Sequence, residues 1–190
     1  MRAFVAVVPP EEALAPLAEA LPALRERWPS LGWIPPERWH LTVCFLGEVS
    51  IETVEALSTS LSTVAGATAP IAAAMGEGGS FPGGRRVRVL WAAVDGGPAL
   101  VDLAGRVTAA ASAAGVPVER RPWSAHLTLA RVRREPPEDA SELRSRLGAA
   151  RGRAFTIDRL VVFRSHLGPK PRYDEVASFR LGAGAPIEKP

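Results

Sequence analysis

His40-Leu41-Thr42-Val43 and His126-Leu127-Thr128-Leu129 are two copies of one His-x-Thr-x pattern. Each copy lies in an alternating run of apolar and β-branched residues, which predicts strands over 38–46 and 125–133. Side chains two positions apart share a face of a strand, so each histidine stands beside its own threonine while the intervening apolar residues enter the core. Two such strands side by side would line one pocket with two imidazoles and two hydroxyls.

Strand and helix patterns alternate along the rest of the chain. Short turns between neighbouring strands favour an α+β fold with antiparallel sheets over a doubly wound parallel one. The partial recurrence of the order strand, helix, histidine-bearing strand, helix predicts that each motif belongs to one lobe of a duplicated fold within a single domain, 1–190. Pro16 and Pro22 should weaken the first helix. The expected helices are 11–28, 50–66, 98–114 and 138–149, the further expected strands 2–8, 69–75, 85–94, 155–167 and 173–181, and the expected glycine-rich loop 76–84.

Composition narrows the class of protein without naming its partner. The 190 residues include 23 Lys and Arg against 20 Asp and Glu, a net charge of only +3. The single cysteine, Cys44, excludes an internal disulfide. No stretch approaches the ~20 apolar residues that span a bilayer, so we expect a cytoplasmic monomer with no membrane partner. Arginine clusters permit an anionic ligand, although the sequence-wide preference for Arg over Lys is the better explanation of any one cluster. The clusters are 85/86/88, 120/121 and 131/133/134.

The paired motifs favour phosphodiester chemistry. An imidazole with a pKa of about 6.5 acts as acid or base near neutral pH, and cleavage of a phosphodiester needs one group of each kind. Threonine hydroxyls can donate hydrogen bonds to the non-bridging phosphate oxygens. One His-x-Thr alone would more often be structural, but two of the three histidines occupy matching motifs. This concentration favours a site that needs neither metal nor cofactor.

The sequences flanking the motifs resemble the RNA 2′,3′-cyclic phosphodiesterases of the two-histidine (2H) phosphoesterase superfamily, also called the LigT-like or 2′-5′ RNA ligase family. The resemblance covers nearly the whole chain. It is carried by Arg2-Ala3-Phe4-Val5-Ala6, Trp39 to Gly47, Arg88-Val89-Leu90-Trp91, Trp123 to Arg131, and Leu167-Gly168-Pro169 with Tyr173.

This resemblance implies a bilobal fold with pseudo-twofold symmetry, in which flanking helices and two antiparallel sheets surround a central cleft. It also implies opening of a 2′,3′-cyclic phosphate on an RNA end or nucleotide to a 2′-phosphomonoester without a metal. Some members join or cleave 2′-5′ linkages without ATP. By resemblance, His126 is the general base for water and His40 the general acid to the 3′ oxygen, although these two roles are exchangeable. Thr42 and Thr128 would hold the phosphate oxygens.

Three further residues are candidates with conditions attached. Arg131 would bind phosphate and Phe45 would stack on a base, but a regular strand points each of them away from its histidine, so each role requires a β-bulge or a strand end. Tyr173 is a second candidate for base stacking, although a structural role as a core or surface aromatic is favoured for it. His166 has no threonine two positions later and is expected at the surface or the rim of the cleft.

Two other functions remain open at the level of sequence. A binding module could hold a nucleotide or RNA end in the same cleft without turnover, although it would not need two proton-transfer groups. A related enzyme could act on a small cyclic phosphate or on a 2′-5′ oligoadenylate instead of an RNA end.

Overall fold

The structure, a computed structural model, describes residues 1–83, 87–119, 121–133, 140–149, 154–168 and 171–182. The helices are α1 (Glu11–Arg27), the 3-10 turn η1 (Pro36–Arg38), α2 (Ile51–Gly66), α3 (Gly97–Ala113) and α4 (Ala140–Ala149). The strands are β1 (Arg2–Val7), β2 (Leu31–Trp33), β3 (Leu41–Glu48), β4 (Ile71–Phe81), β5 (Val89–Asp95), β6 (His126–Val132), β7 (Phe155–Ile157), β8 (Arg159–His166) and β9 (Arg172–Arg180).

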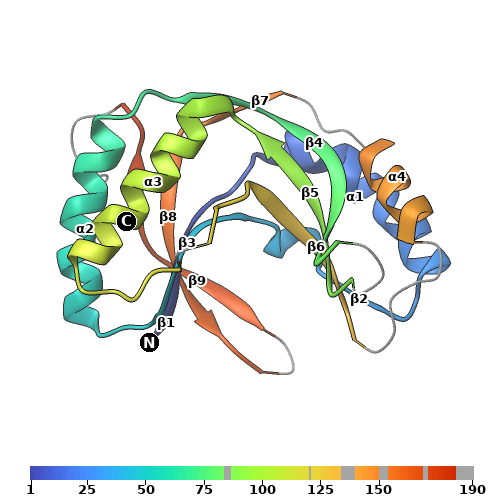
Figure 1. The fold of residues 1–190 in the computed structure, drawn as a ribbon, viewed down its shortest axis with the longest axis horizontal. Coiled ribbons are helices and arrows are strands. Elements are labelled where there is room, and N and C mark those ends of the chain that lie inside the picture. Colours follow the sequence, from blue (N-terminus) through green and yellow to red (C-terminus); the bar gives the residue numbers. More distant parts are fainter. Residues whose placement is uncertain (84–86, 120, 134–139, 150–153, 169–170, 183–190) are drawn as a thin grey trace.

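The strands form one curled antiparallel sheet with two matching halves (Figure 1). Its order is β7-β4-β5-β6-β3-β1-β8-β9, and β2 pairs with β6. Each half therefore places a motif-bearing strand, β3 or β6, at the centre. In the described residues these two strands meet at a single register pair, Leu41 with Leu127. The order confirms the predicted α+β class and antiparallel pairing. The expectation of two separate sheets is wrong, because β3 and β6 pair at Leu41 and Leu127 and join the two halves into one sheet.

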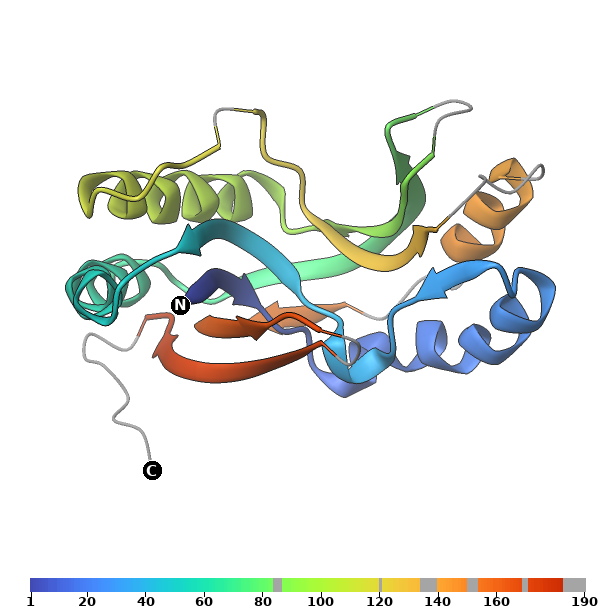
Figure 2. The ribbon, with the colours of Figure 1, turned by 90° about the horizontal axis from the view of Figure 1, so that it is seen from below.

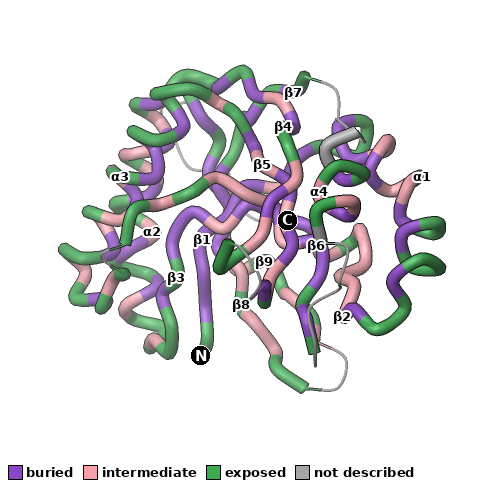
Figure 3. Tube along the Cα trace, turned by 45° about the vertical axis from the view of Figure 1, so that its right-hand side comes forward, coloured by how far each residue is buried: buried purple, intermediate pink, exposed green. Residues whose placement is uncertain are grey.

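The helices cover the two ends of the curled sheet (Figures 1 and 2). At one end, α2 packs on α3 and β9, and α3 packs on β3. At the other end lie α1 and α4, and α4 packs on β4. Buried positions gather along the inner strands (Figure 3), and the buried apolar side chains form one core cluster that spans both lobes. None of the helices in the described part of the chain is long and apolar enough to cross a membrane.

Helix α1 runs without interruption from Glu11 to Arg27, so Pro16 and Pro22 do not break it. Each proline removes one backbone hydrogen bond from the helix. Burial of an apolar stripe outweighs this loss, since four leucines at helical spacing lie in the core: Leu14, Leu17, Leu21 and Leu24.

Three other features of the secondary structure differ from expectation. The glycine-rich segment predicted as a loop is strand as far as Phe81, because β4 continues its pairing with β5 up to Phe81 and Val89. The single strand expected over 155–167 is two strands, because β7 pairs with β4 in one lobe and β8 pairs with β1 in the other. The short strand β2 was not predicted at all. Residues 138–139 of the last expected helix lie outside the described residues.

Strand β4 requires a glycine at position 79 because the Trp91 ring occupies the space of a side chain there. A Cβ atom there would overlap the Trp91 ring, which lies across the β4 backbone. We expect Gly79→Ala to lower the free energy of unfolding by about 1–3 kcal/mol, since overpacking displaces a rigid ring. Urea denaturation would measure this change.

Gly105→Ala in α3 is the matched control, because a Cβ there meets nothing within 4 Å. It should raise stability by about 0.5–1 kcal/mol through helix propensity. A Gly79→Ala protein as stable as the control would show that the Trp91 ring does not need this space.

Candidate active site

The two motifs present the same side chains in the same order. His40 immediately precedes β3, and His126 is the first residue of β6. In both motifs the histidine and threonine are half-buried while the leucine between them is buried. Leu41 and Leu127 are both 0% exposed. The predicted strand parity of His40 with Thr42, and of His126 with Thr128, is therefore confirmed.

A β-bulge interrupts β3 at Val43, the last residue of its motif. Val5 of β1 pairs with Cys44 and the next residue, Ala6, pairs with Thr42, so Val43 has no partner in the register. The extra residue reverses the alternation. Val43 and Cys44 are both buried, and Phe45 is 59% exposed. The expectation that Phe45 points into the core is therefore wrong, because the bulge turns it to the face that carries the histidine.

Strand β6 contains the equivalent bulge. On β5, Leu90 pairs with Ala130 and Trp91 with Thr128, so Leu129 is the extra residue. Leu129 and Ala130 are buried, and Arg131 is exposed. The bulge that a phosphate-binding role for Arg131 requires is thus present. Phe45 and Arg131 occupy equivalent places in the two lobes, each five residues after its histidine.

The pairing of Leu41 with Leu127 brings the motifs together. Antiparallel register continued by one residue on each side sets His40 opposite Thr128, and Thr42 opposite His126. A second contact ties the segment before β6 to β3, because Trp123 Nε1 donates a hydrogen bond of 3.0 Å to the Thr42 carbonyl. These two contacts therefore bring the two motifs side by side.

Both histidines are held in the same tautomer. His40 Nδ1 donates to the Arg38 carbonyl at 2.8 Å, and His126 Nδ1 donates to the Ser124 carbonyl at 2.8 Å. Because a carbonyl can only accept, the neutral ring carries its proton on Nδ1 and leaves the Nε2 lone pair free. Within the described ranges, neither Nε2 atom and neither threonine hydroxyl has a hydrogen-bond partner in the protein.

Burial is the main cause that lowers the pKa of both histidines below the ordinary value of an imidazole. The hydrogen bond from Nδ1 to the backbone opposes this shift in each case. Nearby positive charge adds to it: the Arg131 guanidinium lowers the pKa of both rings, and Arg38 and His126 lower that of His40. The charge of one arginine, Arg131, therefore acts on both imidazoles.

Aromatic rings surround His40. Its ring stacks on Phe4 at a centroid distance of 4.7 Å, and Tyr173 lies edge-on to it at 5.1 Å. The Arg38 guanidinium carbon lies 5.5 Å from the centroid of the Tyr173 ring. Phe45 lies 6.3 Å from Phe4 between centroids. The two base-stacking candidates, Phe45 and Tyr173, are thus both on the His40 side of the site.

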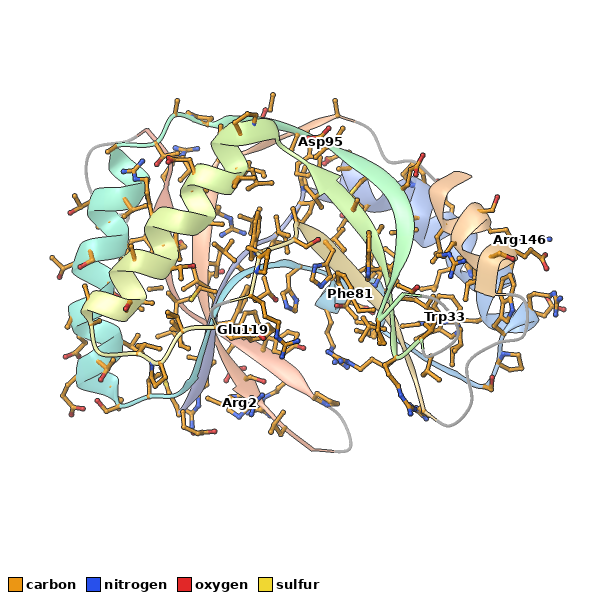
Figure 4. The ribbon with its side chains drawn as sticks, in the orientation of Figure 1. Arg2, Trp33, Phe81, Asp95, Glu119 and Arg146 are labelled. Carbon is orange, nitrogen blue, oxygen red and sulfur yellow. The ribbon has the colours of Figure 1, made fainter. Side chains whose placement is uncertain are left out.

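A separate pair of aromatic rings borders His126. Phe81 meets it edge-on at a centroid distance of 5.0 Å, and Trp91 lies 5.9 Å away. Phe81 and Trp91 also contact each other at 5.0 Å. In Figure 4, Phe81 lies toward the middle of the molecule, whereas Asp95 and Arg146 lie at its periphery.

Sequence reasoning missed four of these neighbours. Phe81 fell in a segment predicted as loop, and its contact with His126 depends on the β4–β5–β6 register, which no local pattern reveals. A signal for Arg38 was available, because it lies two residues before His40 and a ring hydrogen bond to that backbone position is a local contact. Phe4 and Trp91 were recognised only as strand residues.

His166, a possible metal site and the arginine clusters were the other features considered from the sequence. His166 Nε2 is 2.6 Å from Asp174 Oδ2 on the β8–β9 hairpin, as expected for a surface histidine. Among the described residues, no three His, Cys, Asp or Glu side chains come together as a metal site would require. Of the predicted arginine clusters, residues 85, 86, 120 and 134 lie outside the described ranges, while the remaining members are exposed: Arg88, Arg121, Arg131 and Arg133.

The chain is similar to known proteins in both sequence and fold. A family model described as the 2′-5′ RNA ligase superfamily matches residues 9–169. The chain is 30% identical to the RNA 2′,3′-cyclic phosphodiesterase of Geobacillus stearothermophilus over 96% of its own length, and spans 58% of that protein. It is 32% identical to the Thermus thermophilus protein of the same name, over 95% of this chain and 90% of that one. The crystal structure of the Thermus thermophilus protein TT0787 superposes with a TM-score of 0.81 at 28% identity, over 96% and 98% of the two chains. The chain therefore belongs to the 2′-5′ RNA ligase superfamily.

Proposed function

We propose that this chain is an RNA 2′,3′-cyclic phosphodiesterase, which opens a terminal cyclic phosphate to a 2′-phosphomonoester. The observation that carries the proposal is the pair of half-buried imidazoles on strands that meet at Leu41 and Leu127, whose Nε2 atoms have no hydrogen-bond partner among the described residues. The names of the Geobacillus and Thermus relatives support the substrate class. In this proposal the two lobes, residues 1–190, act as one domain.

The reaction needs one proton removed and one delivered. Water attacks phosphorus and loses a proton to Nε2 of neutral His126, while the bond from phosphorus to O3′ breaks. Protonated His40 gives its proton to O3′, so the two rings exchange protonation states and the product leaves with a 3′-hydroxyl. Because the pair supplies both proton transfers, no metal is assigned a role.

Charge at the phosphoryl oxygens needs separate stabilisation. Thr42 and Thr128 have hydroxyls without protein partners in the described ranges, so both are available to donate to the non-bridging oxygens. Arg131 adds a guanidinium on the same face, where its planar fork suits a phosphate. Phe45 and Tyr173 are proposed to stack on the base of the nucleoside that carries the cyclic phosphate, since both lie on the side of the general acid.

Incubation of the purified protein with adenosine 2′,3′-cyclic phosphate in excess chelator tests the reaction. We expect 2′-AMP as the product, at a rate that added divalent cations do not restore or raise. Chromatography that separates 2′-AMP from 3′-AMP makes the measurement. Formation of 3′-AMP, or activity only after metal addition, would contradict the proposal.

A role in binding without turnover is disfavoured by the histidines themselves. A binding site has no use for two rings whose Nδ1 atoms are tied back so that both Nε2 atoms stay free. We also propose a cytoplasmic location, supported by a single cysteine, Cys44, that is free and buried.

A further inference from the structure

Arg38 is a half-buried cation to which the proposed reaction assigns no role. It is the last residue of η1, two positions before His40, and belongs to neither motif. Its Nε atom is shielded from solvent without a hydrogen-bond partner, and its guanidinium forms no ion pair with any residue that the structure describes. Asp174 and Glu175, the carboxylates that follow Tyr173 on β9, pair with other cations. A shielded charge without an acceptor is unfavourable unless a ligand supplies one.

Two contacts hold Arg38 beside His40. The Arg38 guanidinium carbon lies 5.5 Å from the centroid of the Tyr173 ring, and that ring lies edge-on to His40 at 5.1 Å. The Arg38 carbonyl also accepts the hydrogen bond from His40 Nδ1 at 2.8 Å. Contact with an aromatic ring orients a guanidinium while the N–H groups at its edge remain available to a ligand. The Arg38 charge is therefore held next to the proposed general acid.

The electrostatic influence of Arg38 distinguishes its position from that of Arg131. The Arg131 charge lowers the pKa of both motif histidines, whereas the Arg38 charge lowers the pKa of His40 only. A phosphorus atom that both imidazoles serve must lie between them, so Arg38 lies to the His40 side of that atom. The proposed function puts the nucleoside that carries the cyclic phosphate on this same side.

We infer that Arg38 binds a phosphate esterified to the 5′-oxygen of the nucleoside that carries the cyclic phosphate. In an RNA this group is the phosphodiester to the preceding nucleotide, and in a mononucleotide it is a 5′-monophosphate. Both present non-bridging oxygens that suit the planar guanidinium fork. The inference rests on the proposed function and adds to it a residue that selects substrates by their 5′ side.

The test compares substrates that differ at the 5′-oxygen. We would measure kcat/KM for opening of the cyclic phosphate, in chelator, with three compounds: adenosine 2′,3′-cyclic phosphate, its 5′-monophosphate, and the 3′-5′-linked dinucleotide UpA that ends in a 2′,3′-cyclic phosphate. In the wild type, each compound with a 5′-phosphate group should exceed the nucleoside about tenfold, which corresponds to ~1.4 kcal/mol. Arg38→Gln should remove this advantage, and it keeps the backbone carbonyl that binds His40. An advantage for the dinucleotide alone, lost in Arg38→Gln, would identify the diester as the ligand.

The ratio of two kcat/KM values separates phosphate binding from an effect on His40. Because kcat/KM reports the pKa values of the free enzyme, a changed His40 pKa in Arg38→Gln affects all three substrates alike and cancels in the ratio. Arg172→Gln is the matched control. It removes the same charge beside Tyr173, but Arg172 is exposed and its Nε lies 3.5 Å from Asp174 Oδ1, so the ratio should stay at the wild-type value.

The outcomes separate this inference from the function on which it rests. Wild-type protein that leaves the cyclic phosphate of all three compounds intact contradicts the proposed function itself. Wild-type protein that opens all three with equal kcat/KM contradicts the 5′-phosphate site alone. The site is also contradicted if Arg38→Gln lowers kcat/KM for the three compounds by one common factor, or if Arg172→Gln lowers the ratio as much as Arg38→Gln does.

Discussion

Replacement of either motif histidine is expected to lower turnover of a nucleoside 2′,3′-cyclic phosphate by a factor of about 10² or more. His126→Ala removes the group that takes the proton from water, and His40→Ala removes the group that protonates O3′. Neither Nε2 atom has a protein partner in the described ranges, so the loss should come from chemistry and not from unfolding. Initial rates in chelator, with circular dichroism on the same samples, would measure both.

His166→Ala is the control for this pair. It removes a histidine of similar partial burial that interacts with Asp174 on the β8–β9 hairpin. Its rate should remain close to that of the wild type. Because His40 also packs on Phe4, His40→Gln should accompany His40→Ala, and near-wild-type activity in either variant would remove His40 from the proposed mechanism.

Arg131→Gln is expected to lower kcat/KM by a factor of about 10² and to move the pH dependence upward. The rate effect follows from losing a charged donor at the phosphoryl oxygens. The pH effect follows because the Arg131 charge lowers the pKa of both His40 and His126. Without it, each ring holds its proton to a higher pH, so both limbs of the kcat/KM profile shift toward alkaline pH.

Arg133→Gln provides the comparison, since Arg133 is exposed and lies just beyond the end of β6. It should change the rate little and leave both limbs where they are. NMR titration of the histidine Cε1 protons would measure the pKa values directly. If the two pKa values stayed unchanged in Arg131→Gln, the arginine would not lie close enough to act on both rings.

Strand parity predicted the four central side chains because it depends on local alternation alone. His40 with Thr42, and His126 with Thr128, share a face as that alternation requires. The same alternation failed three residues after Thr42, at Phe45. A bulge is a mismatch between two strands, and the extra residue, Val43, is defined only by its unpaired place opposite β1. The sequence of β3 contains no local sign of it.

The aromatic surroundings of the histidines were beyond sequence reasoning for a related reason. Phe81 reaches His126 only through three strands that are distant in sequence, and the glycines before it resemble a loop. Those glycines serve packing instead, because Gly79 makes room for Trp91. Arg131 could be predicted only in part. The sequence identified it as a possible phosphate ligand, but the face to which its side chain points depends on the bulge at Leu129.

The most direct test of paired acid–base catalysis is the pH dependence of kcat/KM in the wild type and in the two histidine variants. The wild type should give a bell-shaped profile, with both limbs at lower pH than two unperturbed imidazoles would give, since both pKa values are lowered. His126→Ala should lose the acidic limb, which reports protonation of the base, and His40→Ala should lose the alkaline limb, which reports deprotonation of the acid. Loss of the opposite limbs would exchange the two roles, whereas a wild-type rate that rises steadily with pH, or variants that keep both limbs, would contradict the paired mechanism.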